Sequence, residues 1–183
     1  MKIITLCLAT VFAGLAAVPA LAAEGKLNFI GKVVNASCKL EGVSDSGVID
    51  VSMGAIPLSR LKNSQSGTGP AVGIDIRVKD CEKGTHYIVV DGPSPAGTPE
   101  NRVLALDGSG KPASKVGILL TDRTGTPLSL DERLDPQHDP RIEIPVDGGS
   151  GTFRLNAFYY TWDKTHADPG DGNATARFTI MQE

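Results

Sequence analysis

Apolar and polar side chains alternate along much of the chain, which is the pattern of a β-strand that buries one face and exposes the other. In the run Ile74-Asp75-Ile76-Arg77-Val78, for example, every second residue is apolar. Alternation of this kind, or enrichment in β-branched and aromatic residues, predicts strands at 27–37, 48–53, 72–79, 86–91, 103–106, 115–121, 141–146, 152–162 and 173–181. The pattern therefore predicts an all-β protein.

Turn-forming residues lie between these segments, as in Asp91-Gly92-Pro93, Asp107-Gly108 and Asp147-Gly148-Gly149. The chain holds 21 glycines and 12 prolines, and no long stretch repeats its apolar residues with the helical period. Helix is therefore expected only as a minor component. Short strands at this spacing are typical of a sandwich of the immunoglobulin type. Neither an internal repeat nor a linker divides the strand-rich region, so we expect a single domain there.

The first and last predicted strands each have an apolar face. In the first strand this face carries an apolar row interrupted by one glycine, namely Leu27, Phe29, Gly31 and Val33. In the last strand it carries Ala174, Ala176, Phe178 and Ile180. Periodicity alone does not distinguish two ordinary half-buried strands from strands with a more specific role.

The chain begins with the parts of a secretory signal peptide. Lys2 supplies a positive charge, residues 3–18 form an apolar run, and Pro19-Ala20-Leu21-Ala22 places small residues before a cleavage bond. A membrane anchor is the alternative, but the apolar run is shorter than a membrane span requires. The pattern predicts a signal peptide at residues 1–22, cleavage after Ala22 and an exported product.

Charge and cysteine usage agree with export. The formal charge is −3 at pH 7 and no basic cluster occurs, which argues against nucleic acid as a partner. Cys7 leaves with the signal peptide, so Cys38 and Cys81 remain, and an even pair in an oxidising compartment predicts one disulfide bond. A metal site or a catalytic thiol is the alternative. A metal site needs a second pair of Cys or His ligands at short spacing, and we find no such pair near either cysteine.

Several segments, taken in order, resemble the subunits of chaperone–usher pili. The run from Leu27 to Cys38, a strand with a glycine in its alternating row that leads into the first cysteine, is similar to the start of a mature pilin. Segments 72–81 and 116–125 resemble the strand that carries the second cysteine and the central strand with its turn. Residues 153–160 followed by 173–180 are similar to the closing hairpin.

This resemblance implies an incomplete immunoglobulin-like β-sandwich that is completed by donor-strand exchange. Such subunits lack their last strand, and the resulting groove is filled first by a periplasmic pilus chaperone and then by the N-terminal strand of the next subunit. The resemblance implies a donor strand at residues 23–37 and a pilin domain at 38–183. The donor residues inserted into a neighbour would be Leu27, Phe29, Gly31 and Val33. The residues facing the subunit's own groove and the chaperone would be Ala176, Phe178 and Ile180.

By the same resemblance, the chain is expected to be a structural subunit of a cell-surface fimbrium that is exported through the periplasm and supports cell adhesion. Its partners would be the chaperone, the outer-membrane usher and neighbouring pilin subunits. A minor adaptor or terminator subunit is the alternative within the family, and a two-domain tip adhesin is not expected. One departure is Gln182, which stands where such pilins usually carry an aromatic residue.

The sequence offers scattered polar groups instead of a recognisable active site. His86 lies in an apolar strand, and His138 and His166 lie in segments rich in Asp, without a Gly-x-Ser-x-Gly motif. We therefore expect neither enzyme activity nor a cofactor. Segment 108–113 faintly resembles a dinucleotide loop and segment 168–173 carries oxygen ligands for calcium. A hairpin turn and a solvated loop are the favoured interpretations.

The alternative from another class is a self-complete secreted β-sandwich that binds a carbohydrate. An aromatic platform near Trp162 would be supplied by Phe158, Tyr159, Tyr160 and Trp162. Alternation divides this group between two faces, so core packing accounts for at least half of it. This alternative predicts a monomer that is stable without a chaperone.

Overall fold

A computed structural model describes residues 38–42, 47–98, 101–107, 110–130, 140–144 and 148–182. The predicted signal peptide and the predicted donor strand lie outside these residues. The described residues all belong to one unit, which spans Val34–Glu183. The proposed boundary between a donor strand and a pilin domain therefore stays a prediction.

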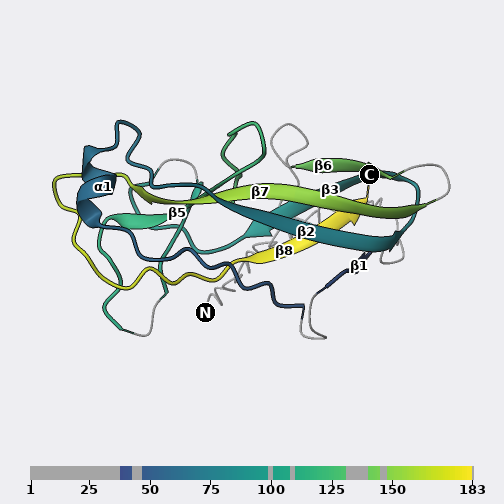
Figure 1. Cartoon of the computed structure of the whole chain (residues 1–183), viewed down its shortest axis with the longest axis horizontal. Helices are drawn as coiled ribbons and strands as arrows, with labels where there is room; N and C mark the ends of the chain where they lie inside the picture. Colours follow the sequence, from purple (N-terminus) through teal and green to yellow (C-terminus); the bar gives the residue numbers. More distant parts are fainter. Residues whose placement is uncertain are drawn as a thin grey trace, which may run out of the picture. The chain divides into compact units, whose positions relative to one another are not determined.

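Two antiparallel sheets make up the fold (Figure 1). The larger sheet has the order β1-β2-β7-β5-β4, with bounds Lys39–Leu40, Val72–Cys81, Gly149–Thr161, Val116–Thr121 and Val103–Leu104. The smaller sheet has the order β6-β3-β8, with bounds Arg141–Ile144, Gly84–Asp91 and Arg177–Gln182. In the described part of the chain, the only helix is α1 at Leu58–Asn63. The prediction of an all-β fold with little helix is confirmed.

Strand alternation places one apolar layer inside the fold. On β2, Ile76 and Val78 are buried, whereas Asp75 and Arg77 are exposed. On the neighbouring strand β7, Phe153 lies opposite Ile76 and is 1% exposed. These residues join side chains from β3 in one apolar core. Each such side chain stabilises the fold by about 1.5–3 kcal/mol when it is fully buried.

A second, smaller apolar cluster lies under α1, which packs against β7. Leu61 is its central residue, 2% exposed and grouped with Val116 and Ala167. The helix ends where the N–H of Ser64 donates to the carbonyl oxygens of Arg60 and Leu61. This helix is far too short to cross a membrane, and the described residues contain no helix that is long and apolar enough to do so.

A disulfide bond joins Cys38 to Cys81, as the sequence predicts. The bond links the residue before β1 to the last residue of β2, and the two strands pair at Lys39 and Lys79. It closes a segment of 43 positions. On the chain-entropy model, a crosslink of that span stabilises the fold by roughly 4 kcal/mol.

The strand predicted at 27–37 lies outside the described residues, and the other predicted strands match the structure closely except in two places. The strand predicted at 48–53 is wrong, because that segment forms no β-ladder. The strand predicted at 173–181 begins only at Arg177, where β8 starts. In both places apolar residues pack against the core without a strand alongside. Alternation reports which side chains are buried, whereas a sheet strand also needs a neighbour for its backbone.

Candidate functional site

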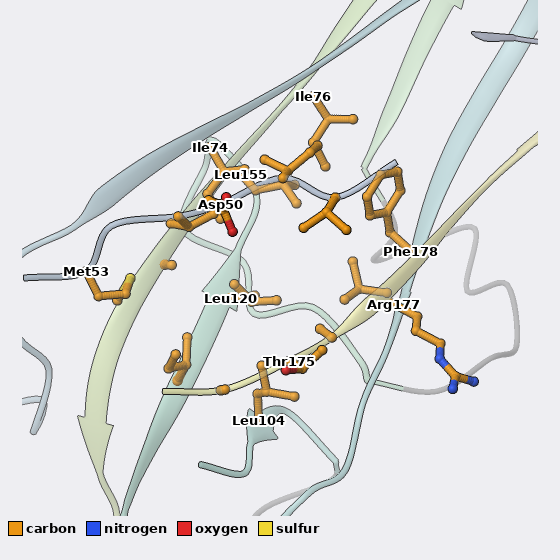
Figure 2. Close-up of a pocket in the computed structure, with 18 of the residues that line it drawn as sticks. Asp50, Met53, Ile74, Ile76, Leu104, Leu120, Leu155, Thr175, Arg177 and Phe178 are labelled. Atoms are coloured by element: carbon orange, nitrogen blue, oxygen red, sulfur yellow. The ribbon is translucent and has the colours of Figure 1, made fainter. Parts of the chain in front are cut away.

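An open groove lies between segments 48–53 and 173–181, the two places where the predicted strands differ from the structure (Figure 2). Residues 47–54 form one side, which we call the N-terminal wall. Residues 172–179, which include the first residues of β8, form the other side, which we call the C-terminal wall. The groove has a volume of about 900 Å³. Both sheets contribute to its lining, so the groove opens directly onto the interior of the fold.

The floor of the groove is apolar. It is formed by Ile74, Ile76, Val90, Leu104, Ile118, Leu120, Leu155, Ala157 and Tyr159. All of these residues belong to the core or pack directly against it. The floor is therefore the core itself, open along one side. Apolar surface of this kind favours contact with another chain, because removing it from water is favourable by about 25 cal/mol per Å².

The N-terminal wall alternates inward and outward side chains as a strand does. Ile49 and Met53 pack against the core, whereas Val48 is 59% exposed and Asp50 is also exposed. Figure 2 shows this wall running along the groove with Met53 and Asp50 on it. Its backbone has no strand partner among the described residues. The wall is thus positioned by its side chains and leaves its main-chain groups available.

The C-terminal wall leads into a strand that is paired on one side. β8 pairs with β3, with Phe178 opposite Val90 and Ile180 opposite Ile88. Along its other side, no strand of the described chain accompanies β8. An edge strand presents a row of unpaired N–H and C=O groups, which is a template for another strand. The groove therefore has a free backbone edge as well as an apolar floor.

The residues predicted to face the groove differ in where they lie. Ala176 and Phe178 line the groove, and Phe178 also packs against the core. Ile180 packs against the core as well, but it is not part of the lining. Arg177 is on the rim, with its guanidinium directed away from the floor (Figure 2). The groove-facing side of the C-terminal wall is therefore small at Ala176 and large at Phe178.

Tyr159 holds one end of the C-terminal wall in place. Its hydroxyl donates a hydrogen bond to the carbonyl oxygen of Gly172, at 3.2 Å. Burial raises the pKa of Tyr159, which keeps this hydroxyl protonated. A Cβ at position 172 would lie 2.5 Å from the hydroxyl oxygen, so a glycine is needed there. Tyr159 therefore has a structural role: its side chain packs against the core, and its hydroxyl binds the C-terminal wall.

The two histidines that the structure describes, His86 and His166, do not form a common site. His86 is buried on β3, His166 is exposed in a loop, and His138 lies outside the described residues. The Nδ1 atom of His166 lies 2.8 Å from Oδ2 of Asp163. Hydrogen bonding from His166 holds the pKa of Asp163 below its usual value.

The two loop segments considered for nucleotide or calcium binding pair with each other. Pro112 bridges to Asp171 and Ser114 bridges to Asp168. The carbonyl oxygen of Lys111 accepts a hydrogen bond from the N–H of Asp171. A dinucleotide loop opens a helix, whereas this segment leads into β5.

Gln182, where the sequence departs from the usual pilin pattern, is the last residue of β8. Gln182 lies opposite His86 in the β3–β8 ladder. Its side-chain amide donates to the carbonyl oxygen of Lys83, at 2.8 Å. Here Gln182 therefore fastens the last residues of β8 to the start of β3 through a polar contact.

The structure also brings together a group that the sequence analysis missed. A ring nitrogen of His86 lies within 4.8 Å of both the Cys38 and the Cys81 sulfur atoms. Among the buried side-chain nitrogen and oxygen atoms of the described residues, only Nε2 of His86 has no hydrogen-bond partner. An unsatisfied buried polar atom costs about 1–3 kcal/mol. One feature of the sequence could have revealed this group: His86 follows Cys81 by only a few residues, across a tight connection between β2 and β3.

Comparison with known proteins places the chain among relatives of one kind. The family described as fimbrial protein matches residues 27–181. The chain is 31% identical over 182 residues to the type-1 fimbrial protein subunit of Serratia marcescens, with 98% of each chain covered. It is 32% identical over 196 residues to the type-1 fimbrial protein A chain of Escherichia coli strain K12, with 100% of each covered. A chain of a solved chaperone–usher pilus is similar in fold, with a TM-score of 0.61, 19% identity, and 92% of this chain and 100% of that chain covered.

Proposed function

This chain belongs to the fimbrial protein family and is a structural subunit of a fimbrium at the cell surface, and we propose that it polymerises by accepting a β-strand from a neighbouring subunit into its groove. The observation that carries the proposal is the open groove, in which an apolar core and a free strand edge face the same space. Strand addition uses both features. Main-chain hydrogen bonds supply affinity, and alternating side chains supply specificity.

An incoming strand would lie between the two walls. Its backbone would pair with the free edge of β8 and with the main chain of the N-terminal wall. Its inward side chains would cover floor residues such as Leu155 and Leu120, and Figure 2 shows Leu120 between the walls. Each large apolar side chain buried there contributes about 1.5–3 kcal/mol. Insertion of several such side chains would give a long-lived joint between subunits.

The segment donated by each subunit is residues 23–37. The face inserted into the neighbour carries Leu27, Phe29, Gly31 and Val33. This row supplies apolar side chains at every second position, as an apolar floor between two walls requires. The opposite face carries Ile30 and Lys32 and points away from the floor. A neighbour of the same kind would thus complete the sandwich.

Before a neighbour arrives, the groove would need a temporary occupant. A groove with an apolar floor beside a free strand edge promotes aggregation. A periplasmic pilus chaperone would cover it after the signal peptide has directed export, and an outer-membrane usher would exchange the chaperone for the next subunit. Both occupants would contact Phe178 and Ile180 on β8 and Ala176 just before it. A terminator accepts no incoming strand, so the open groove favours an accepting subunit over that alternative.

The donor face is tested by a matched pair of substitutions. Phe29→Asp places a charge on the inserted face, and Ile30→Asp places the same charge on the opposite face. We expect Phe29→Asp to abolish polymers without changing the melting temperature of the chaperone-bound subunit, and Ile30→Asp to polymerise as the parent chain does. Polymers that survive mild detergent are counted on gels. Equal polymerisation of the two variants, or unfolding by Phe29→Asp, would show that this strand is not donated.

The open groove is tested by the periplasmic yield of soluble subunit with and without a co-expressed pilus chaperone. We expect soluble protein only with the chaperone, as a one-to-one complex. A stable monomer that accumulates alone would mean that the chain fills its own groove. In that case the self-complete binding domain would replace the present proposal.

A further inference from the structure

Three potential metal ligands meet at the disulfide end of the fold. They are the sulfur atoms of Cys38 and Cys81 and a ring nitrogen of His86, all within 4.8 Å of one another. The cysteines flank the β1–β2 pair, and their Cα atoms are 4.1 Å apart. Two thiolates and one imidazole are a ligand set that Zn²⁺ accepts, with a water molecule as the fourth ligand. The disulfide bond withholds this set in the oxidised chain, because both sulfur atoms are bonded to each other.

The histidine has the state that a metal ligand needs. His86 is 0% exposed, and its Nδ1 lies 3.1 Å from the carbonyl oxygen of Gly84. A carbonyl oxygen only accepts hydrogen bonds, so Nδ1 carries the proton and Nε2 keeps its lone pair. Nε2 is buried and has no partner. With Nε2 as the ligand, the carbonyl oxygen of Gly84 would hold the other ring nitrogen, which is the usual support for a metal-binding imidazole.

We propose that the reduced chain binds one Zn²⁺ ion through Cys38, Cys81 and His86 before the disulfide forms. Both thiols release a proton to solvent, and the ion takes the two thiolates and the neutral imidazole. Closure of the disulfide then transfers two electrons from the thiolates to a disulfide-containing oxidant, which takes up two protons from solvent and is reduced to two thiols, and the ion is released. Bound Zn²⁺ therefore delays closure, because a free thiolate must attack the oxidant and coordination to the ion engages both thiolates.

Accessibility is compatible with this sequence of events. Cys81 is 4% exposed, whereas Cys38 is only half-buried at the entrance to β1. An ion or an oxidant would thus approach from the side of Cys38. The site lies outside the groove, since none of the three residues lines it. The inference is therefore independent of strand exchange.

The test uses the subunit as its soluble complex with the chaperone, reduced with a phosphine and titrated with Co²⁺ as a spectroscopic substitute for Zn²⁺, and the chaperone alone is titrated as the blank. We expect thiolate-to-cobalt absorption that saturates at one ion per chain and is displaced by Zn²⁺. His86→Gln should weaken Co²⁺ binding by about tenfold or more, since one ligand of the set is lost. His166→Gln, at an exposed histidine bonded to Asp163, is the matched control and should bind as the parent chain does. The oxidised chain should show no thiolate absorption.

A second measurement follows the rate of disulfide closure by oxidised glutathione with and without equimolar Zn²⁺. Zn²⁺ should slow closure in the parent chain and the His166→Gln control, and much less in His86→Gln. If the reduced chain is unfolded, Zn²⁺ should restore its β-sheet circular dichroism. Absence of saturable binding, equal affinity in His86→Gln, or a reduced chain that stays unfolded with Zn²⁺ would each overturn the proposal. Slower closure of His86→Gln without any effect of Zn²⁺ would also overturn it, and would identify His86 as a proton acceptor for the thiols.

Discussion

The disulfide end and the groove are two edges of the same sandwich, and they differ in whether a neighbouring strand is present. At the disulfide end, β1 pairs with β2 and a covalent bond joins Cys38 to Cys81, so the partners all come from within the chain. At the groove, Ile49 and Phe178 pack against the core, but no strand of the described chain lies between their walls. Side chains of similar character therefore give a closed edge in one place and an open groove in the other. The difference is the presence of a neighbouring backbone.

The largest expected effect separates the core from the groove. Phe153→Ala removes a side chain that is 1% exposed, and it should lower the free energy of unfolding by about 3–5 kcal/mol. Phe178→Ala removes a half-buried side chain from the groove wall. It should cost about 1–2 kcal/mol while the groove is empty and more when a strand fills it. Urea unfolding of dilute subunit that has been separated from its chaperone and refolded, alone and with a peptide of residues 23–37, measures both.

If Phe153→Ala and Phe178→Ala lowered the free energy of unfolding of the empty subunit equally, Phe178 would be as fully packed as the closed core, and the groove would not be open there. A cost at Phe178 that does not rise with the peptide would place the peptide elsewhere.

Loss of the disulfide probes the closed edge. Cys38→Ser should lower the free energy of unfolding by about 2–4 kcal/mol, because the unfolded chain is no longer crosslinked. Cys81→Ser should cost a similar amount. The double variant should cost little more than either single one, because the same bond is lost. Thermal unfolding measures all three. An unchanged melting temperature in Cys38→Ser would argue against a stabilising bond.

The end of the C-terminal wall is tested by adding one methyl group. Gly172→Ala would place a Cβ 2.5 Å from the hydroxyl oxygen of Tyr159, and it should cost about 1–3 kcal/mol. Gly73→Ala on β2 is the matched control, since a Cβ there meets nothing within 4 Å. Thermal unfolding compares the two variants. If both are neutral, the contact between Tyr159 and Gly172 does not shape the groove.

The smallest expected effect concerns a turn remote from both edges. Burial acts to raise the pKa of Asp122, but hydrogen bonds from Thr124 and Thr126 outweigh it and lower the pKa below 3.8. Ionised Asp122 therefore stabilises the fold above its usual pKa, and this contribution is lost as pH falls toward the lowered value. It should stay below about 1 kcal/mol, because the carboxylate is largely solvated.

Asp122→Asn removes that dependence. The difference in melting temperature between the parent chain and Asp122→Asn should shrink between pH 6 and pH 3. A difference that is constant over this range would show that the charge of Asp122 does not matter to stability.

Much of the fold was predictable because the alternation of apolar and polar residues shows which side chains of a strand are buried. The alternation of Ile74, Ile76 and Val78 identified β2, and the cysteine count identified the disulfide. The same rule failed at 48–53, where the side chains alternate but the backbone has no partner. The approach of His86 to the two cysteines was also missed, because it depends on the connection that sets β3 beside the end of β2.

By itself, the sequence determined which segments bury one face, that two cysteines form a bond, and which family the chain resembles, because each depends on residue type and local spacing. The resemblance implied an open groove, but only the tertiary structure located it between residues 47–54 and 172–179 and brought His86 close to the disulfide. The reason is physical: a groove is defined by a strand that is missing, and a missing neighbour leaves no pattern in the residues that would have paired with it. Whether a buried side chain finds a partner likewise depends on how separate strands are brought together.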